Sequence, residues 1–213
     1  MKSRQEIKAL AKSAAAEQRR VGILTLFLYT VIVLAGAIFN LFPPVGSLIV
    51  LATVAFIDFP LGVGVEGVFI KIFNREKTSV GEMFSSLSVN YMRKVGGMLW
   101  MMLFIYLWTF LLIVPGIIKA FAYSMTPYIL ADCPNVNAKE ALKLSMRMTD
   151  GHKGKLFVLM LSWIGWGLLN VLTLGLLGIF FLNPYMSTTG AGFYVELRDQ
   201  AIANGKIEQS ELA

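Results

Sequence analysis

The sequence predicts an all-α, polytopic membrane protein with six transmembrane helices arranged as three hairpins. Apolar residues make up 56% of the 213 positions and charged residues only 15%, whereas soluble domains carry about 25% charged residues. All Lys and Arg residues except Lys119 fall in four polar stretches, which alternate with long apolar pairs of segments. Because basic residues are retained on the cytoplasmic side of a membrane, this distribution predicts the orientation as well as the fold class.

A helix that crosses the bilayer needs about 20 predominantly apolar residues. The fourth of six apolar segments is the shortest and reaches only ~24 Å at 1.5 Å per residue, so a re-entrant or interfacial path is its alternative. We favour six crossings because that number places all four basic stretches on one face. Lys119, just after the second turn, is then expected to snorkel toward the outer headgroups. The segments are 22–41, 45–73, 95–114, 116–131, 156–174 and 176–195.

Three polar stretches predict amphipathic helices on the cytoplasmic face. Each contains a capping pattern in which Ser or Asn precedes Glu by three residues, and each is followed by a hairpin whose second leg contains a proline. Such helices either lie on anionic lipid or pack on the cytoplasmic ends of the bundle. The capping pairs are Ser3 with Glu6, Ser79 with Glu82, and Asn137 with Glu140, and the prolines are Pro60, Pro127 and Pro184.

This recurrence predicts one integral membrane domain over residues 1–213 that is built from three parallel repeats. Parallel repeats in a membrane are related by an axis along the membrane normal. The alternative is that any six-span protein has three hairpins and a few prolines. The repeats cover 1–76, 77–134 and 135–197, and residues 198–213 are expected to form a polar C-terminal tail.

Composition also limits the chemistry and the partners. With one cysteine, Cys133, and one histidine, His152, an intramolecular disulfide and a cysteine-based metal site are excluded, and we predict no cofactor. The polar, basic first 20 residues predict a cytoplasmic N-terminus rather than a cleaved signal peptide. Basic residues beside apolar spans favour anionic headgroups, at about 1 kcal/mol each, over nucleic acid. The predicted partners are therefore the phospholipid bilayer and, in addition, a membrane protein or a second copy of the chain.

Asp58 is the most unusual residue of the apolar segments. It lies ~18 Å into the second segment, near mid-membrane, where an ionisable group costs roughly 2.5 to 3.5 kcal/mol and needs a partner, water or a proton. Pro60 leaves the Phe56 carbonyl without its N–H donor. Glu66, two turns later, is expected to meet Lys or Arg at the cytoplasmic interface. Either Asp58 lines a polar vestibule for a cation, a headgroup or a proton, or a protonated Asp58 bonds a neighbouring helix.

The three proline kinks suggest that the vestibule extends across the hairpins, although they could equally be packing devices. For Asn170 and Asn183, a hydrogen bond to each other is the alternative to ligand contact. The run 149–155 is interpreted as a headgroup-contacting linker because it lacks the glycine spacing of a phosphate-binding loop. The predicted ligand-binding residues are Asp58, Pro60, Glu66, Tyr123, Pro127, Asn170, Asn183 and Pro184, and the predicted headgroup contacts are Lys139, Lys143, Arg147, His152 and Lys153.

No nucleophile is paired with a base, so the sequence favours a non-enzymatic protein. The leading hypothesis is the binding or movement of a lipid-like or small amphiphilic molecule. The alternative is a scaffold or accessory subunit of a membrane complex, or an immunity protein against a membrane-active peptide.

Several motifs resemble one bacterial family. They are residues 113–125, 138–146, 151–153 and 161–166, with Asn183–Tyr185 and Phe193–Tyr194. Together they are similar to the integral membrane family called domain of unknown function 975. The resemblance implies a plasma-membrane location and a multi-span fold, and it transfers no catalytic residue. Gly154 stands where that family usually has a bulky aromatic residue.

Overall fold

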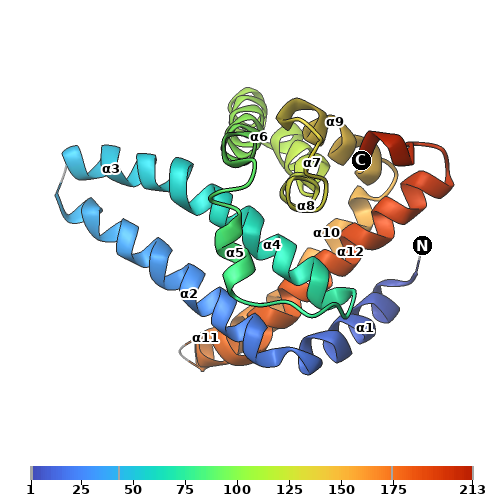
Figure 1. The fold of residues 1–213 in the computed structure, drawn as a ribbon, viewed down its shortest axis with the longest axis horizontal. Coiled ribbons are helices and arrows are strands. Elements are labelled where there is room, and N and C mark those ends of the chain that lie inside the picture. The colour runs from blue at the N-terminus through green and yellow to red at the C-terminus, as the bar shows by residue number, and fades with distance from the viewer. Residues whose placement is uncertain (1, 43, 174, 213) are drawn as a thin grey trace.

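The computed structural model describes residues 2–42, 44–173 and 175–212, and every regular element in those ranges is helical. Figure 1 shows the α2–α3 hairpin projecting from a body in which α4 and α12 lie centrally. Two π-helical turns, Val54–Asp58 and Gly178–Leu182, directly precede α4 and α12. The α-helices are α1 (Arg4–Glu17), α2 (Arg19–Ala37), α3 (Val45–Thr53), α4 (Phe59–Phe73), α5 (Gly81–Ser85), α6 (Tyr91–Leu111), α7 (Ile113–Tyr123), α8 (Thr126–Asp132), α9 (Ala138–Thr149), α10 (Lys153–Leu161), α11 (Ile164–Leu172) and α12 (Asn183–Ala203), with 3₁₀ turns at Ile38–Leu41 and Gln209–Leu212.

Five helical segments of the described residues are long and apolar enough to cross a membrane, which identifies a membrane protein by length and composition. They coincide with the first five predicted segments, the short fourth one included. The sixth predicted segment, 176–195, is not among them. Its helix continues to Ala203 and carries Asn183, Thr188 and Thr189, which lower its apolarity. The five are Arg19–Leu41, Val45–Phe73, Tyr91–Leu111, Ile113–Asp132 and Lys153–Leu172.

The second legs of the hairpins form the core of the protein. Helix α4 packs against both α8 and α12, and the Tyr128 ring stacks on Tyr194 with centroids 5.5 Å apart. Each of these helices has its proline as the second residue, and the regular α-helical hydrogen-bond pattern is interrupted just before it. The predicted kinks lie at these interruptions. The three prolines are Pro60, Pro127 and Pro184.

Two of the breaks before these prolines are closed by hydroxyl groups from other helices. The Tyr91 hydroxyl donates to the Phe56 carbonyl at 2.5 Å, so the acceptor that Pro60 frees is satisfied. At the α7–α8 break, Ser145 Oγ of α9 donates to the Ala122 carbonyl at 2.8 Å and accepts from the Met125 amide at 3.1 Å. Ser145 is fully buried. The small-residue face of α9 thus packs on the bundle, which is the second of the two alternatives for this helix.

The predicted capping patterns form to different extents. Ser3 and Glu6 make a complete capping box, and the Asn137 side chain caps Glu140 at 3.0 Å. The Ser79 pattern differs, because the Glu82 amide bonds the Ser79 carbonyl instead of its side chain. The helix that follows, α5, has only five residues. Serine hydroxyls that bond nearby carbonyls compete with helix formation, and the three serines of 85–88 all do so.

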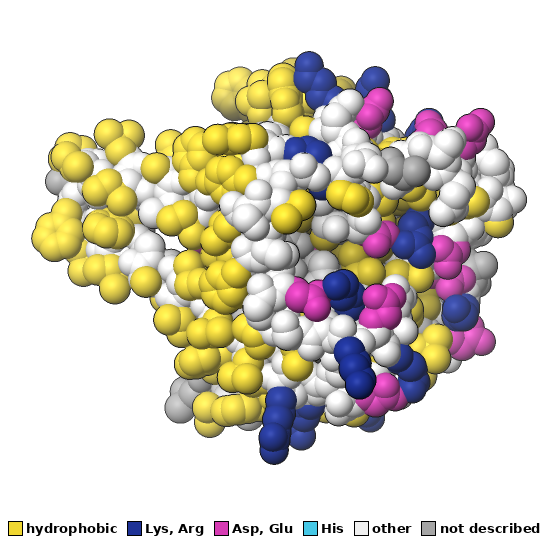
Figure 2. All heavy atoms as spheres, viewed as in Figure 1, with side chains coloured by type: hydrophobic (Ala, Val, Ile, Leu, Met, Phe, Trp, Pro, Cys, Tyr) yellow, Lys and Arg dark blue, Asp and Glu magenta, His cyan; other side chains and the backbone are white. Residues whose placement is uncertain are grey.

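The C-terminal segment differs from the predicted polar tail. Helix α12 runs through residue 198, and Ile207 and Leu212 beyond it are buried. Arg147 of α9 forms an ion pair with Glu211. Figure 2 shows apolar side chains over the projecting hairpin and the adjoining flank, while Lys, Arg, Asp and Glu gather toward the opposite side.

Candidate functional site

The predicted vestibule residues do not converge on one described hollow. Asp58, Pro60 and Pro184 are buried, whereas Asn183 is exposed. Tyr123 lines a groove between α6, α7 and α9, and Pro184 lines a separate hollow beside α1. The three second-leg prolines thus lie at the beginnings of core helices, and Tyr123 and Pro184 line different hollows.

Asp58, the residue before α4, and Glu66 of α4 nevertheless lie near one further polar group. They are eight residues apart, about 80° around the helix. The Tyr29 hydroxyl lies over Gly62, midway between them along the chain, at 3.3 Å from the position that a Cβ would take there. It is within electrostatic range of both carboxyls. Tyr29 of α2 therefore connects the two acidic residues.

Glu66 does not meet Lys or Arg in the described residues, contrary to the expectation from the sequence. The Tyr128 phenol interacts with it instead, and its Oε2 is buried without a hydrogen-bond partner. Glu66 lies too deep in the protein for such an ion pair, because its neighbours on α4 are core residues such as Val65 and Val68.

Asn170 has a local role. Its Oδ1 accepts a hydrogen bond from the Gly178 amide at 2.6 Å, across the turn between α11 and α12. The amide group thereby fixes the start of the π-helical turn. Asn183, at the first position of α12, is on the exposed side of that helix.

The groove between α6, α7 and α9 combines apolar walls with basic groups. Its volume is about 320 Å³. Trp100 and Phe104 stack with centroids 5.6 Å apart, and Phe104 lies 6.4 Å from Tyr123. Leu142 and Met146 of α9 complete the apolar wall. Trp100 and Phe104 are four residues apart and therefore share one face of α6.

Ammonium groups border this groove. Lys139 and Lys143 line it, and Lys139 Nζ lies 5.2 Å from the Trp100 ring centre. Lys119 Nζ lies 5.1 Å from the Trp108 ring and 3.9 Å from Met146 Sδ. Lys119 therefore contacts side chains of both α6 and α9. Cations over aromatic faces gain about 0.5 to 2 kcal/mol.

The other predicted headgroup contacts lie outside the groove. Arg147 pairs with Glu211. His152 precedes α10, and Lys153 is its first residue. Burial, followed by the nearby Lys155 and Lys206 ammonium groups, lowers the pKa of His152 below its usual value.

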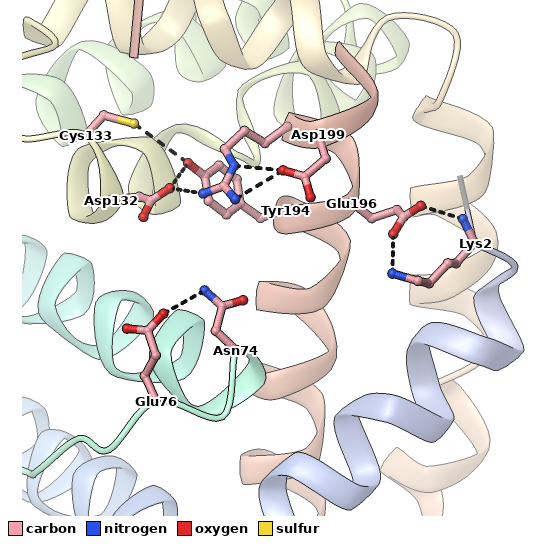
Figure 3. Close-up of polar contacts among 9 residues, drawn as sticks. Lys2, Asn74, Glu76, Asp132, Cys133, Tyr194, Glu196 and Asp199 are labelled. Carbon is pink, nitrogen blue, oxygen red and sulfur yellow. Dashed lines mark hydrogen bonds and ion pairs between the residues drawn. The ribbon is translucent and has the colours of Figure 1, made fainter. Parts of the chain in front are cut away.

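Sequence reasoning missed a polar cluster that joins α8 to α12. Asp132 Oδ2 accepts from the Tyr194 hydroxyl at 2.8 Å and from Arg198 Nη1 at 2.6 Å. Cys133 Sγ lies 3.9 Å from the same hydroxyl. Figure 3 shows these side chains gathered beside α12. The sequence did contain one indication of this cluster, because Asp132 and Arg198 lie at the polar ends of two apolar segments.

The comparisons with known proteins agree with the sequence motifs. No curated protein and no solved structure matches the chain. A family described as "Protein of unknown function (DUF975)" matches residues 98–201. This range covers α9 and most of α6 and α12, hence the groove and the polar cluster. Residues 98–201 are thus similar to the DUF975 family, in agreement with the sequence motifs.

Proposed function

We propose that this protein binds an anionic, lipid-like amphiphile in the groove between α6, α7 and α9, and that it does so without catalysing a reaction. The observation that carries the proposal is the pairing of an aromatic wall, Trp100 and Phe104, with Lys139 and Lys143 along one groove. An amphiphile needs both an apolar contact and a charged one, and this hollow offers them side by side.

The dimensions of the groove suit such a ligand. About 320 Å³ lies within the range of roughly 300 to 1,000 Å³ that is common for small-molecule sites. Tyr123 and Leu142 are buried, so an alkyl chain could lie on them away from water. Lys139 and Lys143 are exposed and remain available to an anionic headgroup, since no ion pair is recorded for either in the described residues.

The membrane arrangement is part of the same proposal. Six crossings, with both termini in the cytoplasm of a bacterium, would bring α9 and its basic residues to the inner face of the plasma membrane. There anionic lipids attract each Lys or Arg by about 1 kcal/mol. The groove would then open where inner-leaflet headgroups are found.

A binding role is favoured over catalysis by the chemistry of the groove residues. Its walls are aromatic and aliphatic, and its charged groups are ammonium groups without a neighbouring carboxyl base. Such a set offers attraction and shape, but no pair for proton transfer.

The second candidate function is that of a scaffold or accessory subunit, or of an immunity protein. The projecting α2–α3 hairpin favours it (Figure 1), because Leu34, Leu41 and Leu48 expose 60%, 75% and 68% of their surface. A partner helix or a second copy of the chain could cover this hairpin, as could lipid.

Native mass spectrometry of the protein, purified in a mild detergent and supplied with phosphatidylglycerol, tests the proposal. We expect bound lipid on the wild type and at least about tenfold less on Lys139→Glu/Lys143→Glu, since each lost ion contact is worth about 1 kcal/mol or more. Arg20→Glu/Lys77→Glu makes the same charge change elsewhere and should retain the lipid.

Two further variants locate the site. Trp100→Ala should weaken lipid binding, whereas Asp58→Asn should not. Loss of lipid in Asp58→Asn alone would move the site to the vestibule on α4. Equal lipid retention in all variants would refute a specific groove and leave the scaffold candidate.

A further inference from the structure

A second hollow, distinct from the proposed lipid groove, lies between α4, α5, the first turn of α6 and α8. Its volume is about 240 Å³. Gly64, Gly67, Lys71 and Asn74 line it from α4, at spacings that place them along one face of that helix. Serine residues of α5 and the end of α8 form the opposite wall. Unlike the groove, this hollow is bordered mostly by polar and charged side chains.

Lys94 is the exceptional residue of this hollow. It lines the hollow from the first turn of α6, and only 7% of its surface is exposed. Its recorded hydrogen bond is a long one, 3.4 Å from Nζ to the Ser86 carbonyl. Among the residues that the structure describes, no ion pair involves it. A buried, unpaired ammonium costs several kcal/mol, so Lys94 lacks a counter-charge.

The carboxylates of the same hollow are engaged elsewhere. Glu82 pairs with Lys71 at 2.5 Å. Asp132 pairs with Arg198 at 2.6 Å. Figure 3 shows Glu76 turned toward Asn74, whose amide donates to it at 3.3 Å. None of the three is therefore the missing partner of Lys94.

The geometry points to a phosphate-bearing ligand in this hollow, with its oxyanion against Lys94. Lysine is a common point-charge partner of phosphate. A phosphodiester carries a single negative charge, which one ammonium balances, while the carboxylates that line the same hollow disfavour more highly charged anions. The phosphate could come from a lipid headgroup or from free phosphate in the cytoplasm.

Lys94 is tested separately from the lipid groove, in a parent protein that carries Lys139→Glu/Lys143→Glu and serves as the wild type of this experiment, so that lipid in the groove does not contribute. This full-length protein, purified in nonionic detergent, is titrated with sodium phosphate, and separately with phosphatidylglycerol micelles, at constant ionic strength. Binding is followed by the melting temperature and by calorimetry. We expect one of the two probes to raise the melting temperature of this parent, and Lys94→Met to bind it at least about tenfold more weakly.

Lys77→Met is the matched control, because Lys77 is exposed and does not line the hollow. It should bind as the wild type does. Lys94→Met removes an unpaired buried charge, so without ligand it should melt no lower than the wild type, and loss of folding cannot imitate loss of binding. A response to phosphate alone assigns the free anion, and a response to lipid alone assigns the headgroup. No response to either probe, or equal binding by Lys94→Met, would overturn the inference.

Discussion

The two legs of the first and of the second hairpin have similar mean hydropathy but different surroundings. On the first legs, Leu34, Phe110 and Leu168 expose 60%, 95% and 66% of their surface. On the second legs, Leu61 and Ile129 expose 1% and 0%. The second legs also contain the helix-starting prolines and close glycine contacts. In a membrane protein, hydropathy therefore shows which segments cross, whereas Pro, Gly, Ser and Thr show which of them pack inside.

The largest effect should come from emptying the core of a second leg. Phe69 of α4 is fully buried, and its ring packs against Gly22 of α2. Phe69→Ala should lower the free energy of unfolding by about 3 kcal/mol or more, since the cavity loses packing contacts. The matched change on a first leg, Phe110→Ala, should cost well under about 1 kcal/mol, because lipid replaces lost contacts. Unfolding in detergent by heat or denaturant measures both, and equal losses would contradict the comparison.

Overfilling a second leg should have the next largest effect. A Cβ at Gly64 would lie 2.3 Å from the Met83 carbonyl oxygen, whereas one at Gly167 of α11 would meet nothing within 4 Å. Gly64→Val should destabilise the protein by about 1 to 3 kcal/mol more than Gly167→Val. Both changes carry the same helix-propensity effect, so their difference reports packing. A difference near zero would mean that α4 and α5 separate easily.

The membrane segments and the capping boxes could be predicted because each depends on residues close together in the chain. The five apolar helices coincide with predicted segments, and Ser3 caps α1 as predicted. The sixth segment shows the limit of this reasoning. Buried apolar residues of this segment, such as Leu182 and Phe193, pack against protein, and hydropathy does not distinguish a protein interior from lipid.

The candidate sites could not be predicted because they depend on contacts between distant residues. Lys139 reaches Trp100 from another helix, and Asp132 and Arg198 are 66 residues apart. Likewise, no local sequence pattern indicates that the Tyr91 hydroxyl donates a hydrogen bond to the Phe56 carbonyl, which Pro60 leaves without a backbone donor. The proline pattern predicts where an acceptor opens, but its partner follows from the packing of the helices.

A smaller effect should follow when a second-leg break loses its hydroxyl partner. Ser145→Ala removes the acceptor of the Met125 amide at 3.1 Å, while the Ala122 carbonyl loses one donor and keeps Thr149 Oγ1 at 3.2 Å. Burying the unsatisfied amide should cost about 1 to 3 kcal/mol. Ser88→Ala removes an exposed hydroxyl that bonds within its own turn, and should change stability by less than about 0.5 kcal/mol. The melting temperatures of the two variants measure this difference. Similar values would mean that the Ser145 hydroxyl of α9 stabilises the protein no more than an exposed hydroxyl does.

The smallest effect concerns pH at the polar start of a first leg. His152 precedes α10, its Nδ1 is buried without a hydrogen-bond partner, and burial followed by the Lys155 and Lys206 charges lowers its pKa from 6.5. The unfolded chain therefore binds a proton more readily than the folded chain does. Stability should be complete above pH 6.5 and decline as pH falls from there toward the lowered pKa of the folded state.

His152→Gln should remove this part of the pH dependence. It is the single histidine of the chain, so the difference in melting temperature between wild type and variant, followed from pH 7.5 to 5, isolates its titration from that of the carboxyl groups. We expect this difference to shift against the wild type as the pH falls, and to be constant above pH 7. A shift in favour of the wild type at low pH would contradict this prediction. It would mean that an acidic side chain pairs with the imidazolium at the start of α10 and outweighs the Lys155 and Lys206 charges.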